Sequence, residues 1–566
     1  MARLAYRYNY THLSPLAMID TISFRDDFSV DWLTQMAQNV VAAFGDNSLT
    51  VFALDLDIPD QAVWDRLERF ATDPTAMVAG LKKIVSDALR LNVNLSAPSL
   101  SAKSIEDFAG LFRAIGLPPV SKTYANDDAF AGMRVIGPNP VMIRRLTERD
   151  LRLPLSDSDF REVVPQDSFD AALAEGRAYL ADYGVLDGIE CGNFPRGQKY
   201  VYAPLALFVV NRATKRLTPV AIQCKQQPGP QNPIFTPLDG YNWMIAKTIV
   251  EIADGNVHQA STHLGRTHLL MEPFVVSTFR QLAPNHPLAV LLAPHFHCTL
   301  AINELAWKQL LADKGGVDQL LGGTIAASRG LVGRSISQTR IQDSYLPKTL
   351  ADRGVADRDA LPDYPYRDDA ALYERAIRDW ATAYLGLYYA SAADVVSDDE
   401  LQAWGREIAS AEGGRIGGMP NDGTFHTVEE LRDVVSFVIF TCSVQHAAVN
   451  FPQYDLMSYA PNMPLAGYRP APTSKATATE ADYLAMLPPL DMAELQMDLG
   501  YLLGSMRYTQ LGQYGSALGA DPRVGPLLSG FQRRLGEIDR TIAERNRTRR
   551  SYETLGATGI PQSINV

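Results

Sequence analysis

The chain has 566 residues, a formal net charge of −12 and 46% hydrophobic residues, which is the composition of an ordinary globular protein. The acidic balance argues against nucleic acid as a partner and against docking on an anionic membrane by net charge. No uncharged run approaches membrane-spanning length, and the first residues lack the apolar core of a signal peptide. We therefore expect a cytoplasmic protein without an integral membrane segment.

The N-terminal part of the chain carries helical patterns. Leu33, Met36 and Val40 recur at helical spacing, and residues 77–89 repeat that pattern. We predict that residues 1–115 form a helical segment packed on a larger domain, and that they contain no β-sandwich. These helices would either pack on the main body or form a lid over a substrate entrance.

The larger domain is predicted to span residues 116–566. Residues 202–210 and 217–224 are β-rich and flank a polar turn, which predicts a small β-hairpin. Residues 240–450 and 475–550 are dominated by helical periodicity. The domain is therefore predicted to be mainly α-helical with small β-hairpins.

Five of the nine histidines lie within one short region, namely His258, His263, His268, His286 and His295. The first three follow one another at intervals of five residues. At roughly 100° per residue, five steps along an α-helix leave two side chains about 140° apart. Such side chains converge only where the helix is widened to π geometry, which is rare and concentrates at functional sites. The spacing indicates either no shared site or a functional distortion of the helix.

A second cluster, QHAAVNFPQY, places His446 and Asn450 four residues apart on one ordinary helical face. Imidazole is a good ligand for iron, copper, nickel and zinc, whereas amide and carboxylate oxygens suit harder ions. Several histidines with one or two oxygens suit octahedral iron better than tetrahedral zinc. A lone histidine in an apolar helix is more often a satisfied core residue, and we interpret His286 and His295 in that way. The patterns predict a metal site without naming its chemistry.

The region from residue 239 to residue 296 closely resembles the central motif of lipoxygenases, His-x4-His-x4-His-x17-His-x8-His, and every interval of the motif is met. The resemblance continues through FTCSVQHAAVNFPQYDLMSYAPNMP and the terminal IAERNRTRRSYETLGATGIPQSINV, and it covers roughly residues 120–566. It implies a large helical lipoxygenase catalytic domain of the bacterial type, without an N-terminal PLAT β-barrel. The resemblance also supplies the π-bulged central helix that the histidine spacing requires.

The resemblance implies one non-haem iron per chain, with manganese as the alternative. The implied ligands are His263, His268, His446, Asn450 and the C-terminal carboxylate of Val566. Family members usually have Ile where this chain has Val566, and Asn where it has Gln562. Neither departure changes the expectation, because the liganding carboxylate belongs to the backbone. Gln259 and Gln453 match family glutamines that orient the ligands through hydrogen bonds.

Two further site features are implied. In the family, one small residue near the metal influences where oxygen adds, and alignment places Ser335 there, or Gly333 with a shift of two residues. Leu264 and Leu269 are candidates for the wall of an apolar acyl tunnel. Plain core packing explains either leucine equally well.

The implied activity is that of a fatty-acid dioxygenase. Fe(III)-OH would take a hydrogen from a bis-allylic carbon of a linoleic, linolenic or arachidonic type of fatty acid, and O2 would add to give a conjugated hydroperoxide. The partners are therefore a polyunsaturated fatty acid and O2, and we expect a monomer. Two alternatives stay open: a lipid hydroperoxide isomerase, and a metal-binding lipid carrier without catalysis. The filled ligand positions argue against the carrier.

Overall fold

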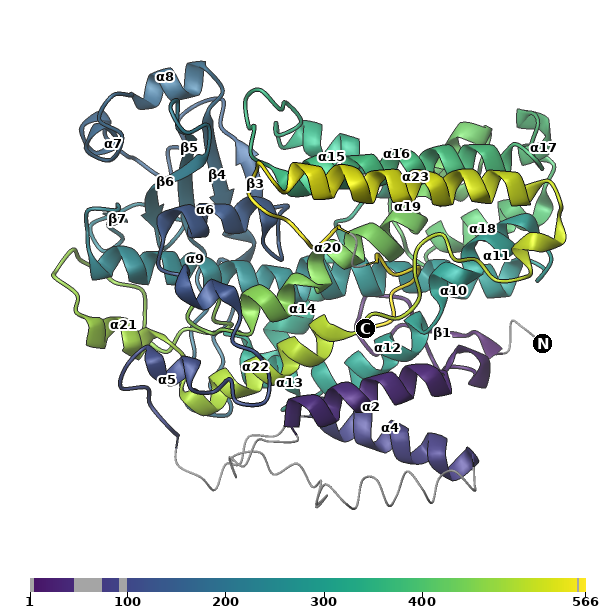
Figure 1. Ribbon diagram of the computed structural model, residues 1–566, viewed down its shortest axis with the longest axis horizontal. Coiled ribbons are helices and arrows are strands. Elements are labelled where there is room, and N and C mark those ends of the chain that lie inside the picture. The colour runs from purple at the N-terminus through teal and green to yellow at the C-terminus, as the bar shows by residue number, and fades with distance from the viewer. Residues whose placement is uncertain (1–4, 45–73, 91–98, 557–558) are drawn as a thin grey trace.

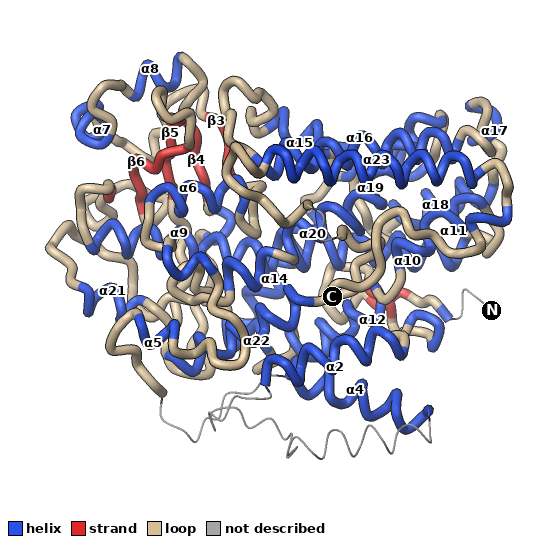
Figure 2. The backbone as a smooth tube through the Cα atoms, in the orientation of Figure 1, coloured by secondary structure: helices blue, strands red, loops and turns tan. Residues whose placement is uncertain are grey.

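A computed structural model describes residues 5–44, 74–90, 99–556 and 559–566. The described chain is mainly α-helical, which confirms the predicted fold class (Figures 1 and 2). The helices are α2 (Val30–Phe44), α4 (Pro74–Arg90), α5 (Glu106–Ala109), α6 (Asp127–Ile136), α7 (Asp157–Val163), α8 (Phe169–Ala174), α9 (Tyr241–Val257), α10 (Leu270–Gln281), α11 (Pro287–Leu292), α12 (Thr299–Leu305), α13 (Gly316–Leu320), α14 (Ile325–Ser337), α15 (Leu346–Asp352), α16 (Pro365–Leu385), α17 (Ala392–Val396), α18 (Asp399–Ala409), α19 (Val428–Phe440), α20 (His446–Asn450), α21 (Glu480–Met486), α22 (Leu490–Ser505) and α23 (Val524–Arg545). Segments of π-helix are His258–Leu269, Ala306–Leu310, Thr441–Gln445 and Gln453–Met457.

The predicted hairpin is present, as part of a larger antiparallel sheet. The strands are β1 (Tyr8–Asn9), β2 (Met18–Ile19), β3 (Ile143–Arg145), β4 (Ala178–Asp182), β5 (Leu205–Val210), β6 (Leu217–Gln223) and β7 (Ile234–Phe235). Strands β3 to β7 pair in chain order in one sheet, and β1 pairs with β2 in another. Every residue of β5 is buried, because helices cover both faces of the sheet. Phe208 stacks on Phe130 of α6, whereas Leu207 belongs to the core that includes Phe160 of α7 and Phe169 of α8.

The central helix is α9, which continues without a break into the π-helix His258–Leu269 and then into α10. A buried polar network joins it to α6: Arg134 donates to Glu251 at 2.6 Å and lies 3.2 Å from Asp254. Asn139 donates to Asp254 at 2.9 Å and accepts a hydrogen bond from the Thr262 hydroxyl at 2.9 Å. Buried charges are stable only when they are paired and hydrogen-bonded in this way. The network therefore fixes the central helix up to the residue before His263.

Two continuous helical stretches are long and apolar enough to cross a membrane, Pro287–Leu310 and Val428–Met457. Their most apolar windows are 67% and 94% buried inside the fold. That burial is typical of core helices, so the described residues offer no clear integral membrane segment.

The described part of residues 1–115 consists of α2, α4, α5 and the β1–β2 pair, and residues 1–4, 45–73 and 91–98 of that segment lie outside the described residues. Helix α2 packs on α4 and on α22, and α4 packs on Ala306–Leu310 (Figure 1). The lid role and the boundary at residue 115 stay predictions.

Candidate metal centre

The π-helix brings two predicted ligands close together, with their rings nearly perpendicular. Nε2 of His263 and Nε2 of His268 lie 3.1 Å apart, and both side chains are buried. His446 enters from α20, with its ring centroid 5.8 Å from that of His263 and 5.1 Å from that of His268. One nitrogen from each of the three rings lies within 4.8 Å of the other two. Intervals of five residues converge here because the widened helix advances fewer degrees per residue than an α-helix.

The C-terminal tail reaches the same cluster. The main-chain oxygen of Val566 lies 3.1 Å from Nε2 of His446. Three side chains from distant elements hold the preceding carbonyls: His295 Nδ1 donates to Gln562 at 2.7 Å, the Thr299 hydroxyl to Ile564 at 3.1 Å and Trp32 Nε1 to Asn565 at 2.6 Å. His295 is thus a satisfied core histidine that holds the tail, as its structural interpretation predicted.

The predicted glutamines lie beside the predicted amide ligand. Asn450 is fully buried, one turn after His446 on α20. Its Oδ1 accepts a hydrogen bond from Gln453 Nε2 at 2.8 Å, and its Nδ2 donates to the Leu503 carbonyl at 2.9 Å. Gln453 Oε1 in turn accepts from Gln259 Nε2 at 2.8 Å. This series of hydrogen bonds fixes the orientation of the Asn450 carboxamide, and it links the two helices that carry the histidines.

Asn303 and Glu272 were missed by the sequence analysis. Nδ1 of His268 lies 3.3 Å from Asn303 Oδ1, and Asn303 Nδ2 donates to Glu272 at 2.8 Å. An Nδ1–H that donates to Asn303 leaves the lone pair of His268 on Nε2, which faces the cluster. Burial raises the pKa of Glu272 to about 7. No periodicity could reveal this contact, because Asn303 lies on α12, far along the chain from His268.

The histidines of the cluster are held neutral. Burial lowers the pKa of His268 to about 4, and burial together with the neighbouring imidazoles lowers the pKa values of His263 and His446 well below the usual range. A metal ligand must offer an unprotonated nitrogen. Three neutral nitrogens shielded from water, one of them next to a main-chain oxygen, fit a transition metal such as iron or manganese.

His258, the first histidine of the motif, belongs to the helix but not to the cluster. Its Nε2 donates to the Val449 carbonyl at 2.7 Å, and burial lowers its pKa to about 4. The unfolded chain has the ordinary value of about 6.5. A depressed histidine pKa contributes stability that is present above about pH 6.5 and is lost as the pH falls through about 4.

The wild-type protein should lose this stability on acidification, and His258→Gln should not. We therefore expect the difference in free energy of unfolding between the two proteins to narrow by roughly 3 kcal/mol as the pH falls from about 6.5 to about 4. The glutamine amide can still donate to Val449, but it does not titrate. Urea unfolding of both metal-free proteins across this pH range measures the gap. A gap that is constant with pH, or that widens on acidification, would contradict a buried neutral His258.

The residues predicted near the oxygen and acyl channels lie in different places. Ser335 lies against Gly265, between the two histidines of the π-helix, so close that a Cβ on Gly265 would come within 2.3 Å of the Ser335 hydroxyl. Gly333 faces away from that helix, toward Ser14 and Pro15. Leu264 and Leu269 are buried in the main hydrophobic core. Their role in a tunnel wall stays a prediction.

Comparisons with known proteins agree with this geometry. The Lipoxygenase family model matches residues 117–564. The chain is 39% identical to a linoleate 9/13-lipoxygenase from Pseudomonas aeruginosa over 524 residues, covering 88% of this chain and 76% of that protein. It is 35% identical to the human hydroperoxide isomerase ALOXE3, covering 79% of this chain and 63% of that protein. The crystal structure of a coral 8R-lipoxygenase superposes with a TM-score of 0.85 at 29% identity, covering 100% of this chain and 80% of that one. The chain therefore belongs to the lipoxygenase family and is a fatty-acid dioxygenase.

Proposed function

We propose that this lipoxygenase holds one non-haem iron and inserts O2 into a polyunsaturated fatty acid to give a conjugated lipid hydroperoxide. The observation that carries the proposal is the convergence of three buried, neutral imidazoles, one of which, His446, lies 3.1 Å from the main-chain oxygen of Val566. The proposed ligands are His263, His268, His446, Asn450 and the carboxylate of Val566. Manganese fits the same donor set, so the metal content of the purified protein distinguishes the two ions.

When bound, iron supplies the one-electron chemistry that breaks a bis-allylic C–H bond, for which no side chain is basic enough at neutral pH. The protein supplies orientation and exclusion of water. Asn303 fixes the tautomer of His268, and the Gln259–Gln453 chain aims the carboxamide of Asn450. The buried surroundings of the cluster keep water away from reactive carbon centres and so suppress side reactions.

Linoleate is the first substrate to try, because the Pseudomonas relative carries that substrate in its name. We expect metal-loaded protein in air to form conjugated diene steadily, seen by ultraviolet absorbance, with one O2 consumed per diene. Protein treated with chelator until its metal is lost serves as the control. Metal-loaded protein that produces no diene from linoleic, linolenic or arachidonic acid would contradict the proposal.

A second candidate is a lipid hydroperoxide isomerase, which the 35% identity to human ALOXE3 favours. Such an enzyme would consume a fatty-acid hydroperoxide without taking up O2 and would oxygenate the parent acid poorly. Running the hydroperoxide and the fatty acid side by side in an oxygen electrode separates the two activities. A metal-loaded protein that turns over neither compound would instead be a lipid carrier.

A further inference from the structure

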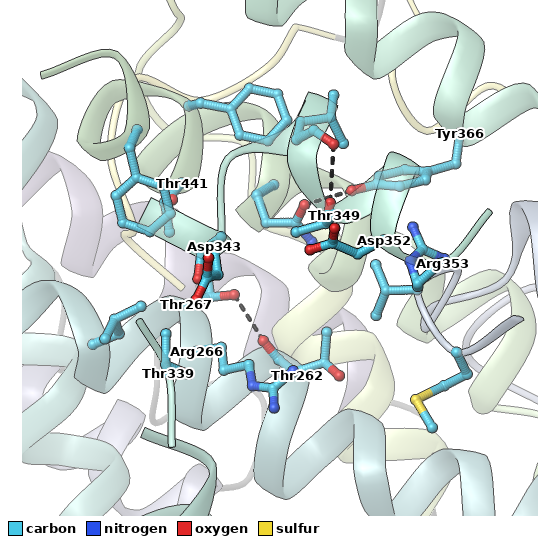
Figure 3. Close-up of a pocket in the computed structure, with 18 residues that line it drawn as sticks. Thr262, Arg266, Thr267, Thr339, Asp343, Thr349, Asp352, Arg353, Tyr366 and Thr441 are labelled. Carbon is cyan, nitrogen blue, oxygen red and sulfur yellow. Dashed lines mark hydrogen bonds between the residues drawn. The ribbon is translucent and has the colours of Figure 1, made fainter. Parts of the chain in front are cut away.

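A cavity of about 340 Å³ adjoins the π-helix that carries His263 and His268. Its walls come from the π-helix His258–Leu269, from the connection between α14 and α15, from α15, from α16 and from the end of α19 (Figure 3). None of the proposed ligands lines it, and neither do Gln259, Gln453, Leu264 or Leu269. The cavity is therefore separate from the histidine cluster, although the two share the same helices.

One guanidinium group on the cavity wall has unused hydrogen-bonding capacity. Arg266, between His263 and His268, is exposed to the cavity, and within the described part of the chain its guanidinium has no ion pair or hydrogen bond. Arg353 is instead fixed within the wall: its Nη1 donates to the Ile143 carbonyl and to the Tyr364 hydroxyl, each at 3.1 Å, and its Nε and Nη2 are fully buried, out of reach of the cavity. A guanidinium is always charged and presents five donors. The Arg266 donors are open to water, and a carboxylate can replace that water with two parallel charge-assisted hydrogen bonds.

The acidic side chains of the lining do not fill this role. Asp343 and Asp352 are both exposed to solvent. Asp352 is paired with Lys348 at 2.6 Å, and Asp343 lies 4.0 Å from Arg340. Neither carboxylate pairs with Arg266, whose positive charge has no counter-ion among the described residues.

The rest of the wall is largely apolar. Val141, Met142, Leu270, Phe437 and Phe440 line the cavity together with several threonines. Its volume is near the lower end of the range for small-molecule sites, which combine apolar walls with a few convergent polar groups. A ligand that fits must carry one anionic, planar head group and an apolar tail.

We propose that this cavity binds a fatty-acid carboxylate, with its head group on Arg266 and its acyl chain against Phe437 and Phe440. The occupant acts as an effector and not as a substrate. Thr262 and Thr267 of the cavity wall directly precede His263 and His268, and Gln445 directly precedes His446. A molecule in the cavity thus contacts both helices that carry the imidazoles, which is the contact that coupling between two sites requires.

Dodecanoate is a suitable probe, because it has no bis-allylic carbon and cannot be oxygenated. Titration calorimetry on the full, metal-loaded chain is expected to show two binding events, one in the catalytic site and one in this cavity. Arg266→Met should weaken one event by about tenfold or more and leave the other intact, since a hydrogen bond to a charged group is lost. Arg266→Lys keeps a positive charge and should weaken that event less. Dodecan-1-ol, which has no carboxylate, should not bind in the cavity.

A second variant tests the same cavity in case Arg266→Met fails to fold. Thr349→Phe adds a ring at the partly exposed wall on α15 and should remove the same binding event by filling the cavity. In linoleate kinetics, dodecanoate in the cavity changes kcat, whereas dodecanoate in the catalytic site raises only the apparent KM. A single binding event that both variants leave unchanged, with purely competitive inhibition, would overturn the proposal. This result does not depend on the dioxygenase proposal, because binding of an inert acid requires no turnover.

Discussion

His446→Ala is expected to abolish diene formation from linoleate, lowering the rate by more than about 100-fold, because even groups that only orient a ligand change metal affinity or activity by roughly 10–100-fold. His446 is fully buried and is the one histidine that faces both the π-helix pair and the main-chain oxygen of Val566. Its loss removes an imidazole donor and opens the cluster on the side of the tail. Metal analysis and an oxygen electrode measure both consequences on the same preparation.

His286→Gln is the matched control. His286 belongs to the same histidine motif, but it caps the N-terminus of α11: its Nδ1 accepts from the Leu288 amide at 3.1 Å, and its Nε2 lies 3.0 Å from Asp398. Glutamine can replace much of this bonding, so metal content and rate should stay near wild type. If His446→Ala kept its metal and its rate, the ligand assignment would be wrong.

The part of the site that could be predicted from the sequence is the part that depends on local spacing. Intervals of five residues between His258, His263 and His268 require a π-helix if the rings are to meet, and the structure has a π-helix over that segment. The four-residue interval between His446 and Asn450 is an ordinary helical one, and α20 provides it. In both cases a single helix carries the geometry, so the order of residues along the chain is sufficient.

The contacts that could not be predicted join elements far apart in the chain. Trp32 holds the carbonyl of Asn565, and Asn303 bridges His268 and Glu272. Such pairs depend on how α2, α12 and the tail pack in three dimensions, which neither periodicity nor residue type encodes. Arg266 is a related case: the sequence shows an arginine between two histidines, and only the packing shows that no described acid lies beside it.

The second change with a large expected effect is the deletion of Val566, the last residue of the buried tail. Deleting this residue is expected to remove metal and activity, because the new terminal carboxylate on Asn565 cannot move into place. The Asn565 carbonyl is held by Trp32 at 2.6 Å, and its side-chain amide donates to the Tyr508 carbonyl at 2.8 Å. Moving the carboxylate one residue forward would break both hydrogen bonds in a buried setting, at a cost of about 1–3 kcal/mol for each group left unpaired.

Val566→Ile separates the carboxylate from the side chain. The buried Val566 socket must accept one more methylene, which costs about 1–3 kcal/mol when a core is overpacked. The backbone carboxylate stays in register, so Val566→Ile should keep its metal and most of its rate, with a lower Tm. Metal analysis and linoleate turnover, measured on the Val566 deletion and on Val566→Ile, show whether the carboxylate or the side chain is needed. A deletion variant as active as Val566→Ile would mean that the tail seals the site without contributing a ligand, and the metal would then be held by the three imidazoles and Asn450 alone.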